Sequence, residues 1–234
     1  MEKLLYEGKA KKVFACDDTD NCIIEYKDTA TALNGLKKED IKGKGLLNST
    51  INNIVFDMLI KNGIPTHFIK TLSPLRILVK KVEIVPLEVI VRNTAAGHFS
   101  SRYGVKEGTL LKAPTLEYSF KNDALDDPLI NDYQIIAIGL ATKEELDIIA
   151  DLAFKINDLM KSFFLKANLN LVDFKIEFGK YKGQILLADE ISPDSCRLWD
   201  ATTNKKLDKD RFRRDMGDVI EAYQEVARRL QTNG

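Results

Sequence analysis

The sequence predicts an α+β fold in which a small antiparallel β lobe lies over a larger lobe of mixed helix and strand. The first third is rich in short β-type segments and contains one helical pattern, over residues 48–62. Further along, a long amphipathic helix begins at Thr142 and is followed by two strands joined by a short turn. Strands that are close in sequence and joined by short turns pair in antiparallel fashion, which is typical of this fold class.

The β-rich lobe is predicted over residues 1–86. Its expected strands, rich in β-branched and aromatic residues, are KLLYEG, KKVFAC, NCIIEYKD, THFIKTL and RILVKKVEIV. Apolar residues recur at helical spacing over 51–59, and Gly63 and Pro65 then stop that helix, whose apolar face we expect to pack on the sheet. No Gly- or Ser-rich linker marks the boundary near Pro86, so we expect a cleft between the lobes.

The larger lobe is predicted over residues 87–234. Residues 104–141 are expected to be irregular, with KNDALDDPLIND as a polar functional loop. Thr142 and Glu145 have capping-box spacing, and the helix that they begin has an apolar stripe through Leu146, Ile149, Ala153, Ile156, Met160 and Phe163. The strands LNLVDFKIEFG and GQILLADEI form the expected hairpin, SPDSCRLWD follows as a loop, and a last helix covers 216–231.

The first strand of this hairpin carries charges on one face. Asp173, Lys175 and Glu177 alternate with apolar residues, so they point to the same side of the pleated strand. If paired residue numbers across the hairpin sum to an even value, Asp189 joins them, together with apolar residues. A solvated face is the simplest interpretation. We favour a site, because Asp and Glu are poor strand formers and partly buried charges must be paired or must bind an ion.

The chemistry that suits this face is nucleotide chemistry. One or two carboxylates, with phosphate and water completing the shell, are the usual ligands of Mg²⁺ at an ATP site, and Glu177 and Asp189 are the candidates. Near the N-terminus, YEGKAKKVF places Gly8 before several lysines, a pattern that allows phosphate to approach the backbone. Taken alone, this segment is better interpreted as a hairpin turn that carries surface lysines, and the carboxylates of the later hairpin strengthen the phosphate-binding interpretation.

Composition excludes several other classes of protein. The 35 basic and 35 acidic residues of the 234-residue chain cancel, so bulk charge attracts neither nucleic acid nor an anionic membrane. The apolar runs are much shorter than the roughly 20 residues of a membrane-spanning helix. Three cysteines without metal-type spacing favour a reduced, cytoplasmic protein. We therefore expect small-molecule substrates.

Four stretches, YEGKAKKVF, EVIVRNTAAG, LVDFKIEFG and DEISPDSCRLWD, are long and occur in order, and KNDALDDP and DKDRFR extend the match. On these residues the chain resembles the SAICAR synthetase family nearly from end to end. The resemblance implies a two-lobed fold related to ATP-grasp and kinase-like folds. It also implies that ATP phosphorylates the carboxylate of carboxyaminoimidazole ribonucleotide (CAIR) and that the amine of L-aspartate displaces phosphate, giving SAICAR and ADP. A homo-oligomer, at least a dimer, is implied as well.

The same resemblance implies roles for individual residues. It places the Mg²⁺ ligands at Glu177 and Asp189. Contacts to ATP are implied for Gly8, Lys9 and Lys11 and for a hinge from Lys81 to Val85. The implied catalytic and substrate-binding residues are Lys175, Asp173, Arg197, Arg92, Asp194, Lys121, Asp127 and Arg213.

His98 departs from the pattern of the family, which commonly has serine after AAG. In the functional interpretation, the His98 imidazole or the Ser100 hydroxyl contacts the substrate phosphate. In the alternative interpretation, His98 has only a structural role, as a lone histidine often does. The other histidine, His67, is interpreted as structural.

Two other functions remain open from the sequence. A kinase-like small-molecule phosphotransferase would share the lobes and the metal carboxylates, although the HRD and DFG motifs of protein kinases are absent. A nucleotide-binding regulatory module is the third hypothesis, and the complete set of Lys175, Glu177 and Asp189 argues against it.

Overall fold

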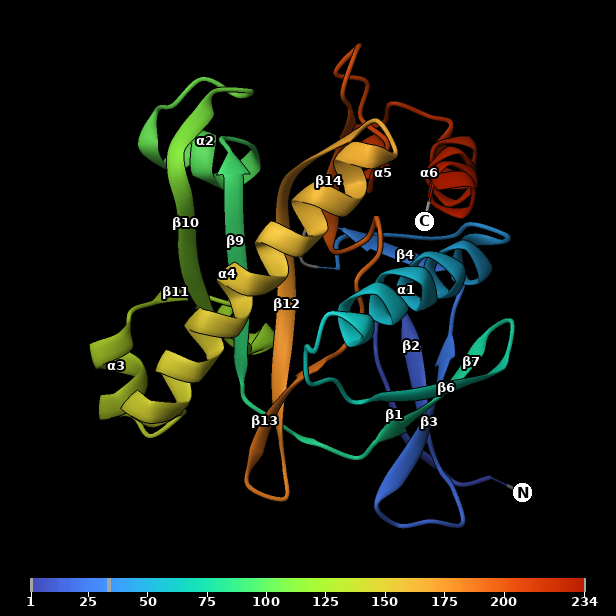
Figure 1. Cartoon of the computed structure of the whole chain (residues 1–234), viewed down its shortest axis with the longest axis vertical. Helices are drawn as coiled ribbons and strands as arrows, with labels where there is room; N and C mark the ends of the chain where they lie inside the picture. Colours follow the sequence, from blue (N-terminus) through green and yellow to red (C-terminus); the bar gives the residue numbers. More distant parts are fainter. Residues whose placement is uncertain (1, 33–34, 234) are drawn as a thin grey trace.

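The computed structural model describes residues 2–32 and 35–233 and confirms the α+β class (Figure 1). Its helices are α1 (Lys44–Lys61), α2 (Gly97–Tyr103), η1 (Asp123–Leu125), α3 (Asp132–Ala137), α4 (Lys143–Lys166), α5 (Asp210–Arg213) and α6 (Val219–Asn233). The strands are β1 (Leu4–Glu7), β2 (Lys11–Ala15), β3 (Asn21–Tyr26), β4 (Thr29–Ala32), β5 (Lys37–Asp40), β6 (Phe68–Ser73), β7 (Arg76–Lys80), β8 (Glu83–Ile84), β9 (Leu87–Thr94), β10 (Leu110–Phe120), β11 (Leu129–Ile130), β12 (Leu169–Tyr181), β13 (Gln184–Ala188) and β14 (Cys196–Asp200).

The N-terminal sheet has the strand order β1-β2-β3-β7-β6, and its paired strands are antiparallel. These are the strands expected from the N-terminal segments. Their inner side chains form a small core of Cys22, Ile24, Tyr26, Ile77 and Val79. The sequence did not suggest the small β4-β5 sheet, because strands as short and polar as KKED carry little β-type signal.

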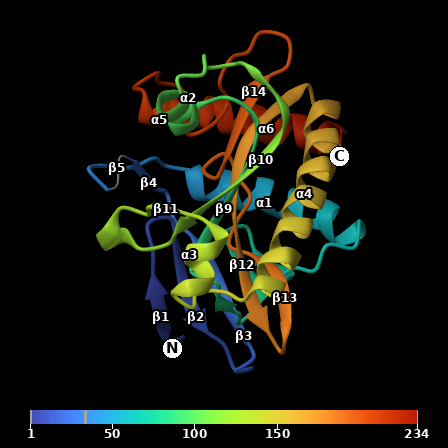
Figure 2. The ribbon, with the colours of Figure 1, turned by 90° about the vertical axis from the view of Figure 1, so that its left-hand side faces the viewer.

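The second sheet has the order β11-β10-β9-β12-β13, and β8 and β14 also pair with β12. Figure 1 shows β12 running through the middle of the molecule with α4 crossing in front of it, and Figure 2 shows α4 along one side of the sheet. The apolar face of β12 is fully buried at Phe174, Ile176 and Phe178. β12 pairs with β9 on one side and with β13 and β14 on the other. These pairings fix the position of its other face, which carries Asp173, Lys175 and Glu177.

Two segments of this lobe that were predicted to be irregular contain strands. Residues 110–120, expected to be irregular, form the longest partner of β9, and β10 escapes a pattern-based prediction because it contains Pro114 and is mostly exposed at its start. The expected loop SPDSCRLWD ends in strand β14, so Cys196 and Arg197 lie on a strand that pairs with β12.

Helix α1 begins at Lys44, earlier than predicted. Its buried residues Ile51, Val55, Phe56 and Leu59 belong to the large core shared with β12, α4 and α6. The predicted packing on the N-terminal sheet is confirmed in part, since the Phe56 ring lies 6.0 Å from that of Phe68 on β6, while the larger core buries most of the apolar face of the helix.

Helix α4 confirms its predicted start. The Thr142 side chain accepts a hydrogen bond from the Glu145 backbone, and the Glu145 carboxylate accepts one from the Thr142 backbone, which completes the capping box. The predicted stripe is buried except for half-buried Phe163, and Phe164 is the fully buried residue beside it. Local capping and periodicity were therefore sufficient to place this helix.

The β12-β13 hairpin exists, but its predicted register was wrong. Glu177 pairs with Ala188 and Phe178 with Leu187, so paired numbers sum to an odd value. Leu187 consequently lies in the core and does not share the charged face. Asp189 still comes close to Glu177, because the strand ends at Ala188 and Asp189 adopts a left-handed backbone with φ 58°. The reversal of the backbone, and not strand alternation, directs this carboxylate toward the charged face.

Candidate functional site

A cavity of about 360 Å³ lies between the N-terminal sheet and the charged face of β12. Its lining brings together most of the predicted residues: Gly8, Lys9, Lys11, Lys81, Lys121, Asp127, Lys175, Glu177, Asp189 and Asp194. Apolar side chains from β2, β3 and β7 cover one end. An apolar slot that continues into charged groups is the general character of a nucleotide site.

Two carboxylates form the centre of the cavity. Glu177 is 3% exposed, and burial followed by the negative charge of Asp189 raises its pKa. Burial also favours a higher pKa for Asp189, but the ammonium of Lys11 outweighs this effect and lowers the pKa of Asp189 to about 2. Glu177 and Asp189 are therefore neighbouring buried acids in one cavity, and a bound cation would relieve their mutual repulsion.

Three lysines pair with carboxylates around this centre. Lys11 binds Asp189, Lys121 binds Glu177, and Lys175 binds Glu88 of β9. Each ammonium therefore lies beside an acid and points into the same cavity. Such a set of alternating charges can exchange its internal partners for phosphate oxygens and a divalent cation.

The polar loop after β10 reaches the N-terminal glycine segment. Lys9 forms an ion pair with Asp123 of η1 at 2.7 Å, and both side chains are more than half exposed. Asp127 accepts a hydrogen bond from the Asn122 backbone at 2.8 Å and so shapes the loop. The predicted functional loop thus supplies Lys121, Asp123 and Asp127 to the cavity lining.

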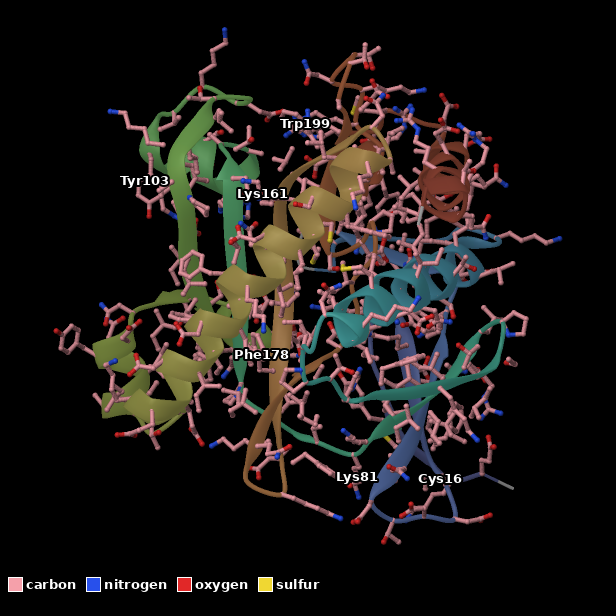
Figure 3. All side chains as sticks on the ribbon, viewed as in Figure 1. Cys16, Lys81, Tyr103, Lys161, Phe178 and Trp199 are labelled. Atoms are coloured by element: carbon pink, nitrogen blue, oxygen red, sulfur yellow. The ribbon has the colours of Figure 1, made fainter. Side chains whose placement is uncertain are left out.

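The predicted hinge is only partly at the cavity. Lys81, Val82 and Ile84 line it, whereas Val85 is buried in the core and its backbone N–H donates to the Phe178 carbonyl. Figure 3 shows Lys81 at the end of the molecule formed by the N-terminal sheet and Trp199 at the opposite end.

Asp194 lies deep beside the cavity with several cations around it. It accepts hydrogen bonds of 2.6 Å from Lys44 and from the Tyr223 hydroxyl. Burial opposes its ionisation, but Lys209 and Lys44 lower the pKa of Asp194 well below its usual range. Asp194 therefore joins α1, α6 and the loop before β14, in addition to facing the cavity.

An arginine cluster lies beyond the cavity lining and comprises Arg92, Asp173, Arg197, Asp210 and Arg213. The register of β12 places Asp173 opposite both Arg92 of β9 and Arg197 of β14. Asp173 Oδ2 accepts from Arg92 Nη1 at 2.7 Å and from Arg197 Nη1 at 2.8 Å. Asp210 binds Arg197 at 2.9 Å and Arg213 at 2.7 Å. The guanidinium groups offer forked donors for phosphate or carboxylate.

Helix α2 borders the arginine cluster. His98 is exposed on it, while the Ser100 hydroxyl is buried and has no hydrogen-bond partner among the described residues. Gly97 packs against the Arg197 guanidinium, and a methyl group built on Gly97 would lie 2.9 Å from Arg197 Cζ. Contact this close requires glycine.

Replacing Gly97 with alanine is expected to weaken binding of an anion by the arginine cluster, because the new methyl group must displace Arg197. Gly97 has φ 52°, so backbone strain contributes as well. The control is Gly104→Ala, since Gly104 has φ 65° but nothing within 4 Å of the added methyl group. We expect the KM of the anionic substrate to rise about tenfold or more in the Gly97 variant, the equivalent of about 1.4 kcal/mol, and to stay near wild type in the control. An equal rise of KM in both variants would show that backbone strain alone acts, and no rise in either would contradict the prediction.

Several site residues were not found from the sequence. Glu88, Glu190 and His67 line the cavity, Lys44 supports Asp194, and Asp210 holds two arginines. His67 was interpreted as structural. It is 3% exposed, and burial followed by the charge of Lys11 lowers its pKa to about 4, so it lines the cavity as a neutral ring. Lys209 and Asp210 could have been found from the sequence, because they belong to the family-like stretch DKDRFR. Arg213 was the residue selected from that stretch.

The donor set of the site fits Mg²⁺ better than a transition metal. Among residues 2–32 and 35–233, no group of three or more His, Cys, Asp or Glu side chains is arranged to hold a metal. Mg²⁺ at an ATP site needs only one or two carboxylates because phosphate oxygens and water supply its other ligands. Glu177 and Asp189 meet this requirement, and their mutual repulsion favours a cation between them.

Comparison with known proteins identifies the family. The family model of SAICAR synthetase matches residues 4–230. The chain belongs to the SAICAR synthetase family. A phosphoribosylaminoimidazole-succinocarboxamide synthase of Clostridium kluyveri is 58% identical over 231 residues, which cover 99% of this chain and 98% of that protein. SAICAR synthetases are ATP-dependent ligases of de novo purine biosynthesis.

Solved structures of SAICAR synthetases agree with the fold. The crystal structure of the synthase from Ehrlichia chaffeensis has a TM-score of 0.96 at 45% identity and covers 98% of both chains. A SAICAR synthetase in complex with ADP has a TM-score of 0.94 at 49% identity and covers 96% of both chains. Within the part of the chain that the structure describes, no helix is long and apolar enough to cross a membrane.

Proposed function

We propose that this chain joins CAIR and L-aspartate to give SAICAR, ADP and phosphate through an acyl phosphate. The observation that carries the proposal is the continuity of the site. The cavity leads from apolar side chains past Glu177 and Asp189. Asp173 of the arginine cluster lies four residues before Glu177 on the same face of β12. One strand thus aligns a nucleotide end with an end that can bind a phosphorylated substrate.

The carboxylates Glu177 and Asp189 would hold Mg²⁺. When bound, this ion would neutralise charge on the phosphates of ATP. In the present arrangement Lys11 and Lys121 compensate the two carboxylates, and both lysines are placed to turn toward phosphate oxygens instead. We expect Lys11 to contribute most, since its side chain is 15% exposed and fixed between Asp189 and Glu190.

The chemistry proceeds by two displacements. A carboxylate oxygen of CAIR attacks the γ-phosphorus of ATP and ADP leaves, so that a poor acyl donor becomes an acyl phosphate. The amine of aspartate then attacks the acyl carbon, phosphate leaves and the nitrogen loses a proton. Positioning and charge stabilisation account for most of such catalysis, and the fixed lysines and arginines on β2, β9, β12 and β14 provide both.

Changing Arg92 or Arg197 to lysine is expected to raise the KM for CAIR about tenfold or more and to change the KM for ATP little. Lysine keeps the charge but loses the forked geometry, and both arginines lie outside the nucleotide cavity. Steady-state kinetics with each substrate varied in turn provides the measurement. An equal rise for ATP and CAIR, or no rise, would contradict their assignment to the ribonucleotide.

Product formation tests the function directly. The protein is incubated with magnesium-ATP, CAIR and aspartate, and ADP and the new ribonucleotide are followed together. ADP release that requires both co-substrates supports the ligase. Release without dependence on aspartate would indicate a phosphotransferase instead, and no release would indicate a nucleotide-binding module.

We also expect a cytoplasmic homodimer. Light scattering at the working concentration tests the dimer, because a 26.4 kDa particle would correspond to a monomer.

A further inference from the structure

Lys209 is a largely buried cation in the lining of the cavity. It immediately precedes α5 and lines the cavity with Asp194 and Ser195. Figure 2 shows α5 at the end of the molecule opposite β1 and β2. Along α5 the chain runs from Lys209 to Arg213 of the arginine cluster. Lys209 therefore lies where the nucleotide end and the arginine cluster meet.

Lys209 differs from the other cavity lysines in its hydrogen bonding. Five other cavity lysines donate a hydrogen bond to a protein oxygen. The pairs are Lys9 with Asp123, Lys11 with Asp189, Lys80 with the Thr66 carbonyl, Lys121 with Glu177 and Lys175 with Glu88. Lys81 is exposed. Over the described ranges, the Lys209 ammonium makes no hydrogen bond, and its ion-pair contact is Asp194 Oδ2 at 3.9 Å. That carboxylate is already held by Lys44 and Tyr223.

A largely buried ammonium without a close acceptor is suited to bind an anionic ligand. The Lys209 side chain is 15% exposed, and burial lowers its pKa even though Asp194 works in the opposite direction. A desolvated ammonium without a close acceptor is unfavourable, and a carboxylate from a ligand would supply the missing hydrogen bonds.

We propose that Lys209 binds a carboxylate of the amino-acid substrate. This inference rests on the proposed ligase function, in which the amine must reach an acyl carbon between the metal carboxylates and the arginine cluster. The phosphorylated substrate has Arg92, Arg197 and Arg213 available for its own anionic groups. Lys209 is the cation left at the junction to hold the carboxylate of the attacking amino acid.

Lys209→Met is expected to raise the KM for aspartate at least ~30-fold, the effect of removing one partner of a desolvated charge pair. The KM values for ATP and CAIR should stay within about threefold of wild type, because their charged groups have other partners. The preference for aspartate over asparagine then tells which carboxylate Lys209 binds. It falls in Lys209→Met if Lys209 holds the side-chain carboxylate, and it stays unchanged if Lys209 holds the α-carboxylate, which both amino acids carry.

The control is Lys205→Met, which removes an exposed lysine from the same loop and should leave all three KM values unchanged. Wild-type turnover with CAIR and aspartate is measured first, so absence of that turnover refutes the ligase function and not the role of Lys209 alone. If methionine prevents folding, Lys209→Gln is measured in the same way. An unchanged KM for aspartate, or a larger rise for CAIR than for aspartate, would overturn the proposal.

Discussion

Glu177→Gln is expected to abolish most ligase turnover while the protein remains folded. The amide keeps the shape of the side chain but loses the charge that would hold Mg²⁺ with Asp189. Turnover should fall by more than the roughly 10- to 100-fold that loss of an outer-sphere partner causes at metal sites. Stability in the absence of metal should be unchanged or higher, because the Asp189 charge already raises the pKa of Glu177. Lys121, which loses its partner, is 44% exposed and can be solvated.

Thermal melting with and without magnesium-ATP, together with turnover at saturating substrates, checks this prediction. Glu225→Gln is the matched control, since Glu225 forms ion pairs with Arg228 and Arg229 on α6 outside the cavity lining. We expect near-normal turnover in the control. A Glu177→Gln protein that melts at lower temperature yet turns over near-normally when folded would rule out the ligand role and would indicate a structural pair with Lys121.

Asp173→Asn is expected to produce the largest loss of stability among these variants. One carboxylate oxygen holds two guanidinium groups, and Asp173 is 4% exposed. Breaking a buried ion pair by removing one partner costs about 3–5 kcal/mol. We expect a value near 3 kcal/mol, because Arg92 keeps Glu117 and Arg197 keeps Asp210 as partners. Urea denaturation gives the free energy of unfolding.

Asp123→Asn provides the comparison for the Asp173 variant. Its partner is Lys9, and because both side chains are largely exposed the expected loss lies between about 0 and 1 kcal/mol. Equal losses of unfolding free energy in the two variants would contradict the prediction. They would show that Glu117 and Asp210 are sufficient to hold Arg92 and Arg197.

Elements with local signals could be predicted from the amino-acid sequence. The capping box at Thr142 fixes the start of α4, since both hydrogen bonds form within one helical turn. The hairpin was equally predictable, because a short turn containing Lys and Gly separates its two strands. In the structure, Lys182 and Gly183 adopt the positive φ angles of such a turn. The candidate metal ligands Glu177 and Asp189 were selected from the charged face of the predicted hairpin. A resemblance spread over long motifs supported them and indicated most cavity lysines, and the structure brings these residues into one cavity.

The contacts between these residues depend on the folding of the whole chain. Strand register depends on packing of the whole sheet, so the odd register of β12-β13 and the left-handed turn at Asp189 could not be derived from alternation. The partners Glu88 of Lys175 and Lys44 of Asp194 lie 87 and 150 residues away in sequence. Local pattern carries no information on such pairs, because they form only when separate strands and helices bury their apolar faces in one core and thereby fix which charges are left facing each other.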